Sequence, residues 1–545
     1  MFKMIKNSNL WKLFLVSSVL VLYFSCGQTG FPPELFTRAE LTQYEETSLH
    51  ADVMNFVNTL KKQSDIVHVE AMGTSLKGRE IPLVVLSDPP VKTPEEALET
   101  GKMVVYIQGN IHAGEVEGKE ASLELMREIV LGSKSYLLEN QIILFSPIYN
   151  ADGNDSLSES RRAGTTPFKA GTRASGEGYD LNRDGMKLDA LETKALVGNV
   201  LLKWDPAVLV DLHTTNGSYH GYALTYAPSY HTAGHPGPSE YTMDVLLPAV
   251  TDKVLERSGL PMYLYGGFRG NPPTRWTTYN HHPRYVTNYM GLRNRIGILS
   301  ETFRYDTFEK RIFSAKMFVL TILEYTNDHS EEINKVLIKA TDETIGQALQ
   351  NAGNFQKGVN FTMVALDEPF ELLVRDTETI PSETGRRGQS RMTGMISRYP
   401  NVQNFNKFEP TKMSTFPRGY IFPAELQNVK EKLTEHGIIV TELLSESTFE
   451  GEEFTITSFS QGRNYEKHQL VSIEGTFNSA TKTFPKGFYK VDLAQQLGNL
   501  AFYLLEPEAD DGLVVWNFFG DYLIEQGVEN GETAYPVFKY FNQQK

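Results

Sequence analysis

The sequence predicts an α/β fold, in which a sheet is flanked by helices, followed by a smaller β-rich α+β C-terminal region. Two observations predict this arrangement. Between residues 103 and 326, apolar segments of strand length alternate with amphipathic segments of helix length, as in α/β sheets. After residue 348 the pattern changes to short β-rich segments. The length of 545 residues also exceeds that of one ordinary core, so more than one domain is expected.

The elements of the first region follow this alternation in chain order, after a helical pattern at 44–62. We expect strands at 103–108, 141–147, 207–212 and 296–300, and helices at 117–131, 188–204, 243–258 and 308–326. Each helical segment has apolar residues at three- and four-residue spacing, which gives a helix one apolar face. A catalytic domain covering residues 27–335 is therefore expected.

The C-terminal region, residues 336–545, follows a polar helical segment at 332–348. We expect strands at 361–365, 371–375, 419–423, 438–443, 501–505 and 513–518, and a helix at 424–436. No motif in this region translates into chemistry. It could pack against the catalytic domain, restrict access to it or bind another partner, and structural support is the simplest interpretation.

The composition is that of an ordinary soluble globular chain. Apolar residues make up 40% of it and charged residues 22%. A formal net charge of −15 argues against nonspecific binding to nucleic acid, which needs clustered lysine and arginine. No nucleic-acid partner is expected.

The N-terminus has the pattern of an export signal. Three lysines precede an apolar run at 13–24 that is too short to span a bilayer as a helix (Lys3, Lys6, Lys12). Ser25 and Cys26 follow the run, and Cys26, directly after this small residue, resembles the cysteine of a bacterial lipoprotein signal. The resemblance implies that residues 1–26 are removed or modified, that Cys26 is lipidated and that the protein is exported to the periplasm or cell surface on a membrane anchor. A plain signal peptide is the alternative.

Any metal site must use histidine and carboxylate ligands, because Cys26 is the only cysteine. His112 and Glu115 follow one predicted strand, His213 ends a second, and Glu301 follows a third. Ligands favour the edge of a sheet where its strands end. Two imidazoles and one carboxylate leave a fourth zinc position open for water. The sequence thus predicts a zinc site at His112, Glu115 and His213, with Glu301 as general base.

Two further motifs lie between the first and last of these residues, Asn150-Ala-Asp-Gly153 and Tyr179-Asp-Leu-Asn-Arg-Asp184. With them, the order and spacing of motifs over residues 73–325 resemble the zinc metallocarboxypeptidases of the carboxypeptidase A type. The resemblance implies a mixed twisted sheet flanked by helices and one Zn²⁺ per chain. It also implies that Asn182 and Arg183 grip the terminal carboxylate of the substrate, and that Asp180 supports the first histidine ligand.

The resemblance implies two more residues whose positions the motifs do not fix. An arginine between the two motifs stabilises the oxyanion, for which Arg162 is our choice, with Arg161 and Arg173 as alternatives. A tyrosine before the catalytic glutamate caps the bound substrate, for which Tyr289 and Tyr279 both qualify.

These residues predict an exported zinc metallocarboxypeptidase that removes C-terminal amino acids from peptides by means of a zinc-activated water. The partner is a peptide or another carboxylate-bearing amide. One alternative is a zinc amidohydrolase acting on N-acyl amino acids or murein peptides, because such enzymes share the Asp-Leu-Asn-Arg type of segment. Another is a noncatalytic binding lipoprotein, although binding alone would not need Glu301.

Overall fold

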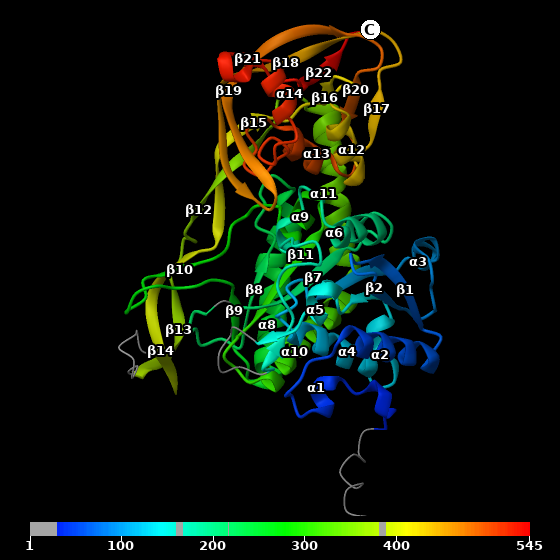
Figure 1. Ribbon diagram of the computed structural model, residues 1–545, viewed down its shortest axis with the longest axis vertical. Coiled ribbons are helices and arrows are strands. Elements are labelled where there is room, and N and C mark those ends of the chain that lie inside the picture. The colour runs from blue at the N-terminus through cyan, green and yellow to red at the C-terminus, as the bar shows by residue number, and fades with distance from the viewer. Residues whose placement is uncertain (1–29, 160–166, 216, 381–388, 545) are drawn as a thin grey trace, which may run out of the picture.

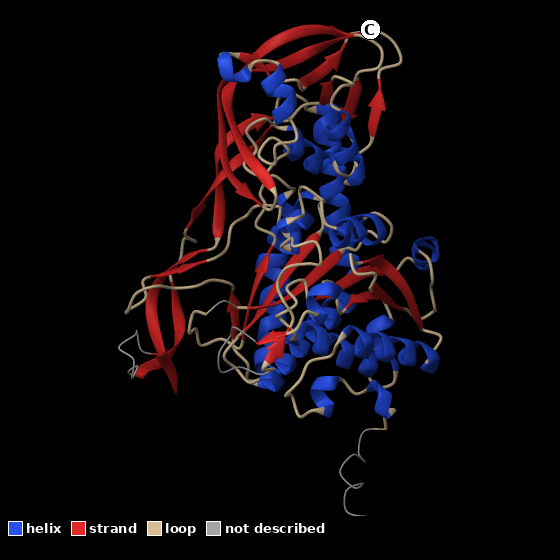
Figure 2. Ribbon diagram, viewed as in Figure 1, coloured by secondary structure: helices blue, strands red, loops and turns tan. Residues whose placement is uncertain are grey.

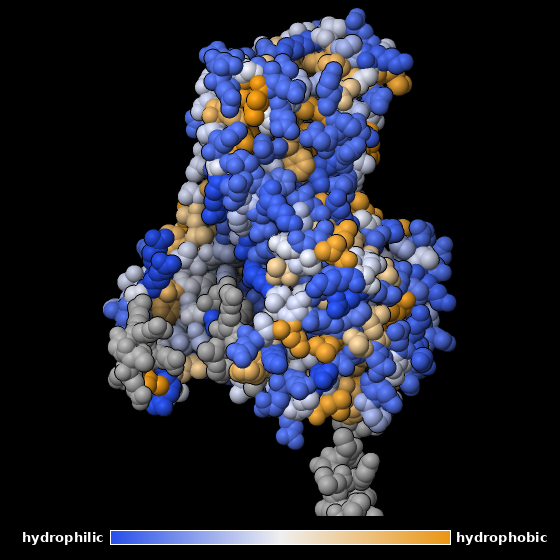
Figure 3. Space-filling model, in the orientation of Figure 1, coloured by the Kyte–Doolittle hydropathy of each residue, from blue (hydrophilic) through white to orange (hydrophobic). Residues whose placement is uncertain are grey.

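The computed structural model describes residues 30–159, 167–215, 217–380 and 389–544 (Figure 1). The predicted signal peptide, with Cys26, lies outside the described residues. Within the part of the chain that is described, no helix combines the length and apolar character needed to cross a membrane. The face seen in Figure 3 is largely hydrophilic, with apolar residues scattered over it.

A mixed eight-stranded sheet forms the centre of the N-terminal half, in the order β1–β2–β4–β3–β7–β11–β8–β9 (Figure 1). The central strands β4, β3, β7 and β11 are parallel, whereas β1, β2 and β8 run antiparallel to their inner neighbours. The strands are β1 (Val67–Thr74), β2 (Glu80–Leu86), β3 (Met103–Gly109), β4 (Gln141–Ser146), β7 (Val208–Thr214), β8 (Leu224–Pro228), β9 (Met262–Leu264) and β11 (Ile296–Thr302). The parallel strands are nearly continuous apolar runs because both faces of the sheet are covered.

Helices cover this sheet, with α4 and α10 packed together on one side and α6 and α9 on the side nearer the C-terminal region (Figures 1 and 2). The helices are α1 (Arg38–Leu41), α2 (His50–Gln63), α3 (Pro94–Thr100), α4 (Glu117–Val130), α5 (Ala151–Asp155), α6 (Leu191–Ala195), α7 (Pro236–Tyr241), α8 (Leu247–Ser258), α9 (Val286–Leu292) and α10 (Phe308–Asp328). Turns of π-helix extend α6 and precede α8, at Leu196–Leu201 and Thr242–Leu246. Short strands β5 (Ser158–Glu159) and β6 (Lys169–Ala170) pair with each other.

Helix α4 approaches β7 unusually closely at Gly118. A Cβ atom at this position would lie 2.5 Å from the Cβ of Leu212. Glycine therefore lets the first turn of α4 pack directly on β7, the strand that carries His213. Any larger residue would push the two elements apart.

The C-terminal region is built around a seven-stranded sheet and long antiparallel hairpins (Figure 2). Its strands are β12 (Gln356–Val364), β13 (Phe370–Ile380), β14 (Gln389–Phe405), β15 (Lys407–Thr415), β16 (Gly419–Phe422), β17 (Val440–Glu442), β18 (Ser447–Tyr465), β19 (His468–Phe484), β20 (Tyr489–Asp492), β21 (Thr533–Ala534) and β22 (Phe538–Gln543). Its helices are α12 (Gln427–Glu435), α13 (Gly498–Leu505) and α14 (Gly520–Glu525). Strand β14 also pairs with β10 (Arg275–Thr277), which joins the two regions.

Helix α11 (Ser330–Gln350) links the two regions and packs against both α7 and α13. The expected boundary at residue 335 lies inside this helix, and the division into 27–335 and 336–545 stays a prediction.

The fold class and the main elements of the central sheet are confirmed, but two predicted C-terminal strands are wrong. Residues 501–505 belong to helix α13, and residues 513–518 form turns and a bend. Every residue of α13 is buried. A short apolar run that is buried on all sides has no periodicity to separate a helix from a strand, which is why the sequence misled here.

Candidate active site

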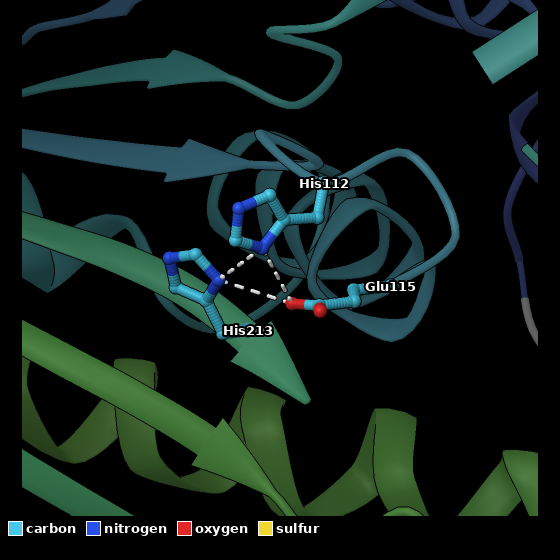
Figure 4. Close-up of side chains that lie close together, drawn as sticks. All are labelled: His112, Glu115 and His213. Atoms are coloured by element: carbon cyan, nitrogen blue, oxygen red, sulfur yellow. Dashed lines mark hydrogen bonds and ion pairs between the residues drawn. The ribbon is translucent and has the colours of Figure 1, made fainter. Parts of the chain in front are cut away.

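Three side chains meet at one point, two from the loop that follows β3 and one from the C-terminal end of the neighbouring strand β7 (Figure 4). His112 follows β3, Glu115 precedes α4, and His213 lies near the end of β7. The Nδ1 atoms of the two histidines are 3.1 Å apart. Oε2 of Glu115 lies 3.3 Å from Nδ1 of His112 and 3.0 Å from Nδ1 of His213. All three side chains are buried.

This triangle fits a zinc ion. Ligand atoms bound at about 2.0–2.1 Å in a tetrahedron lie about 3.3 Å from one another, close to the distances seen here. Two imidazole nitrogens and a carboxylate oxygen are also a donor set that catalytic zinc uses. Acceptor atoms that lie this close together in a buried place repel one another, and a cation between them would offset that repulsion.

A carboxylate holds the far nitrogen of each histidine. Nε2 of His112 lies 3.1 Å from Asp180, and Nε2 of His213 lies 2.6 Å from Asp211. An N–H donated to a carboxylate at Nε2 leaves the Nδ1 lone pair for the metal, and it fixes the orientation of the ring. Burial lowers the pKa of His213, but Asp211 and Glu115 raise it more, so it lies well above its ordinary value. Both observations indicate a site that attracts a cation.

The loop that carries the first two ligands is held by its own backbone and by one asparagine. Asn110 adopts a left-handed conformation, with φ of 68°, which asparagine tolerates better than most residues. Its side-chain amide donates to the carbonyls of Ala113 and Glu115, and the amide of Glu115 donates to the carbonyl of His112. The turn from β3 into α4 is therefore fixed on both sides of the ligands.

Glu301 faces the same point from the next strand. It lies in β11 at the register position opposite His213 of β7, and its side chain is buried. Both residues line a cavity of about 80 Å³. A carboxylate here can take a proton from a water held beside the three ligands.

A buried ion pair ties the ends of these two strands together. The carboxylate of Glu117 accepts hydrogen bonds from the hydroxyls of Thr214 in β7 and Thr302 in β11, and it pairs with Arg311 at 3.1 Å. The relative position of His213 and Glu301 thus depends on a side chain in the first turn of α4.

The Asp180–Arg183 segment forms one wall of the cavity. Arg183 and Asn182 both line it, and the Arg183 guanidinium lies over the ring of Tyr285 at 4.5 Å. Burial raises the pKa of Asp180, but hydrogen bonding to His112 and the charges of Arg183 and Arg173 lower it further, well below its ordinary value. Asp180 is therefore ionised, as a brace for a metal-bound imidazole should be. The amide of Asn182 lies 3.4 Å from Nε2 of His213 and its oxygen accepts from the backbone of Val286, so Asn182 is already partly engaged.

Of the arginines considered for the oxyanion, the structure describes Arg173. It lines the cavity, donates to Asp180 at 2.9 Å and lies 3.8 Å from Glu115. Arg162, our choice, and Arg161 lie outside the described residues. Arg173, the alternative, is therefore the arginine that the described structure brings to the site.

Tyr289 does not reach this cavity. It lies in α9 with 1% of its surface exposed, and its hydroxyl is 2.8 Å from Nδ1 of His436. This buried hydrogen bond does not fit the capping role predicted for Tyr289. The other candidate, Tyr279, lines the cavity, with its hydroxyl 3.0 Å from Thr287.

Three residues at the site were given no role by sequence reasoning. The sequence could have indicated Asp211. Residues two apart in a strand lie on the same face, and Asp211 stands two residues before His213. Tyr265 and Tyr285 line the cavity but lie in segments without a recognisable motif. Burial, with the charges of Glu301 and Glu115, raises the pKa of Tyr265, so its hydroxyl stays protonated.

A second group of possible metal ligands, His281, His282 and Asp510, lies between the two regions. Both carboxylate oxygens of Asp510 already have hydrogen-bond partners. One oxygen of Asp510 is 3.0 Å from Nε2 of His281 and accepts from the backbone of Phe361 at 3.2 Å, and the other accepts from the hydroxyl of Tyr503. These contacts describe a hydrogen-bonded network that joins the regions.

Comparison with known proteins agrees with the motifs. Residues 53–226 match the family model for zinc carboxypeptidases. Carboxypeptidase 2 of Trichophyton rubrum is 22% identical over 499 residues, which cover 88% of this chain and 84% of the relative. Carboxypeptidase 2 of Trichophyton equinum is 23% identical over 501 residues, with 88% and 84% covered. These matches support a carboxypeptidase, a hydrolase of peptides, and the similarity extends into the C-terminal region.

Two solved structures are also similar to parts of this chain. A metallo-carboxypeptidase from Burkholderia cenocepacia has a TM-score of 0.38 at 16% identity, with 51% of this chain and 68% of that chain covered. Carboxypeptidase A from Helicoverpa armigera has a TM-score of 0.36 at 18% identity, with 56% and 76% covered.

Proposed function

We propose that this protein is a zinc metallocarboxypeptidase that removes single amino acids from the C-termini of peptides. The observation that carries the proposal is the cluster of His112, Glu115 and His213, whose three ligand atoms lie 3.0–3.3 Å apart beside Glu301. The presence of Arg183 in the same cavity supports a substrate with a free carboxylate. A guanidinium binds a carboxylate through two parallel hydrogen bonds.

Zinc held by these three side chains would supply a Lewis acid and lower the pKa of a water to about 7. Glu301 takes the proton of that water and later delivers it to the leaving amine. General acid–base transfer of this kind contributes about 10²- to 10⁴-fold. Arg183, with Asn182 beside it, holds the terminal carboxylate so that the bond to be cut lies next to Glu301.

The oxyanion that forms at the carbonyl needs a nearby cation. Arg173 and Arg162 are both proposed for this role, and the position of Arg173 in the cavity favours it. Replacing each with methionine separates them, since the arginine that meets the oxyanion lowers kcat by about 10²-fold or more when it is lost. The other replacement is expected to leave kcat near that of the wild type.

We also propose that the protein is exported and anchored through a lipid on Cys26. The support is the N-terminal sequence: lysines, a short apolar run and the only cysteine at its end. Metabolic labelling with a fatty-acid analogue tests it. Label on the wild type and none on Cys26→Ser is the expected result, and equal labelling of both contradicts the anchor.

The activity is tested with a mixed library of peptides, each present as the free acid and as the C-terminal amide. The zinc-loaded chain is expected to remove one C-terminal residue from the free acids only, as read by mass spectrometry. A chelator and Glu301→Gln should each abolish the reaction, whereas Glu309→Gln, on the surface of α10, should not.

Three outcomes separate the alternatives. Cleavage of amides as readily as free acids contradicts the role of Arg183. No peptide cleavage, with hydrolysis of N-acyl amino acids or murein peptides, contradicts the carboxypeptidase. Binding of zinc without any hydrolysis indicates a noncatalytic protein.

A further inference from the structure

The long β18–β19 hairpin of the C-terminal region reaches the wall of the active site. It runs from the C-terminal region toward the central sheet (Figure 1), and its turn is formed by Glu466 and Lys467 between Tyr465 and His468. The turn meets the segment of residues 177–189, which contains Asp180 and Arg183. Most of that segment is irregular, so it has no sheet ladder of its own to hold it.

Three consecutive residues of the hairpin bind that segment. The carboxylate of Glu466 accepts from the backbone N–H of Asp180 at 3.0 Å. The ammonium of Lys467 donates to the carbonyl of Glu177 at 2.7 Å and lies 3.6 Å from the centre of the Tyr179 ring. His468 lies 2.8 Å from the carboxylate of Asp189. The contacts fall on both sides of the Asp180–Arg183 stretch.

Tyr465, which precedes the turn, is packed between two other side chains. It stacks on Trp516 at 6.1 Å, and the guanidinium of Arg284 lies 5.5 Å from the centre of its ring. Burial lowers the pKa of the Arg183 guanidinium, but Tyr285, Asp180 and Tyr465 raise it above its ordinary value. Of these groups, the ring of Tyr285 lies 4.5 Å from the Arg183 guanidinium.

The residues of the turn do not match its backbone conformation. Glu466 and Lys467 both have positive φ, 46° and 67°, as in the two-residue turns that favour Asn-Gly. Residues with side chains rarely occupy both positions. An unfavourable conformation kept at a contact with a functional segment indicates that the side chains are needed there.

We propose that the β18–β19 turn is a positioning element of the active site, in which Glu466 and Lys467 fix the segment that carries Asp180 and Arg183. The C-terminal region thereby contributes to substrate binding and to the metal site through Asp180, which braces His112. The expected effect of the turn on peptide hydrolysis rests on the proposed function, whereas its expected effect on zinc affinity does not.

The decisive variant is the pair Glu466→Asn and Lys467→Gly in the full chain. It gives the turn the residues that its backbone favours, so the hairpin is expected to fold at least as well, but it removes both side-chain contacts. The matched control is Glu453→Gln with Lys482→Met, which removes an acid and a lysine that pair within the same hairpin away from the turn.

Two readouts are measured for both double variants: the zinc dissociation constant, by competition with a chelating dye, and kcat/KM for a free-acid dipeptide. The turn variant is expected to bind zinc about tenfold more weakly, as for loss of other outer-shell support, and to lose kcat/KM at least as much. Its melting temperature should not fall. Wild-type values of both constants in the turn variant overturn the proposal, as does an equal loss in the control. If the wild type hydrolyses no peptide, the proposed function fails, and zinc affinity alone still tests the turn.

Discussion

Two clusters of histidine and carboxylate side chains lie in the described part of the chain, and they differ in what surrounds them. In the first, His112 and His213 each have a separate carboxylate on Nε2, which leaves both Nδ1 atoms facing the third ligand. In the second, a single carboxylate, that of Asp510, is the hydrogen-bond partner of His281 and accepts from a backbone amide and a tyrosine as well. The residue types are nearly the same.

The charges around the two clusters differ as well. The pKa of His213 is raised well above its ordinary value by its carboxylates, despite burial. The pKa of His282 in the second cluster is lowered to about 4, chiefly by burial and further by Arg284 and His281. The surroundings of His213 and of His282 thus favour opposite charge states of the two rings. We expect the partners of the ligands, and not the proximity of ligand types alone, to decide which cluster holds metal.

The largest expected effect comes from His213→Ala. Loss of one of three ligands should remove the bound zinc, and with it peptide hydrolysis should fall by about 10⁴-fold or more. Zinc content by atomic emission and kcat/KM are measured on the same samples. His281→Ala is the comparison, and it should keep the zinc content of the wild type. Loss of zinc from His281→Ala would show that the second cluster also holds metal.

Asp211→Asn tests whether the carboxylates that hold the histidine ligands contribute to zinc affinity. Zinc affinity should fall by about 10- to 100-fold, because His213 loses the partner that orients its ring. Competition with a chelator measures it. Asp510→Asn should leave zinc affinity unchanged. If Asp211→Asn also has no effect, the ligands alone are sufficient and the distinction between the clusters is wrong.

Asp510→Asn should instead weaken the fold. The free energy of unfolding is expected to fall by about 1–3 kcal/mol, because buried donors lose an acceptor at the contact between the two regions. Urea unfolding measures it. Glu343→Gln, which breaks an exposed pair with His235, serves as control and should change the stability by less than about 1 kcal/mol. Equal losses would mean that the second cluster is no more than a surface pair.

The smallest expected effect is on acid stability. The folded pKa of His282, about 4, lies below the value of about 6.5 in an unfolded chain, so protons favour the unfolded state. The stability from neutral His282 is complete above pH 6.5 and is lost as the pH falls toward 4. His282→Gln removes this dependence and should reduce the loss between pH 7 and pH 5.5 by about 1 kcal/mol. Urea unfolding at both pH values tests it, and identical losses in both proteins contradict it.

Much of the fold followed from local patterns. The buried parallel strands of the central sheet are long apolar runs, and the helices between them are amphipathic, so both were visible in the sequence. The C-terminal region was harder. Its helix α13 is buried on every side. In the central sheet, the edge strand β1 and its neighbour β2 gave no separate signal. In both cases the chain's neighbours in space, which the local pattern does not contain, determine the structure.

The sequence by itself determined which residue types gather at the edge of the central sheet. His112, Glu115, His213 and Glu301 are the right residue types at the ends of predicted strands, and parallel strands bring their ends to one edge. Placing those four residues needs only spacing along the chain and the geometry of a strand. The roles predicted for Asp180 and Arg183 came instead from the resemblance to zinc metallocarboxypeptidases.

Only the tertiary structure decided which residues complete the site. Tyr289 and Tyr279 fit the sequence equally well, but packing buries the hydroxyl of Tyr289 against His436 and leaves Tyr279 at the cavity. Glu466 is 286 residues from Asp180, and nothing local to either predicts their contact. The physical reason is that spacing fixes which residues share a strand end, whereas contacts between distant segments depend on how whole elements pack.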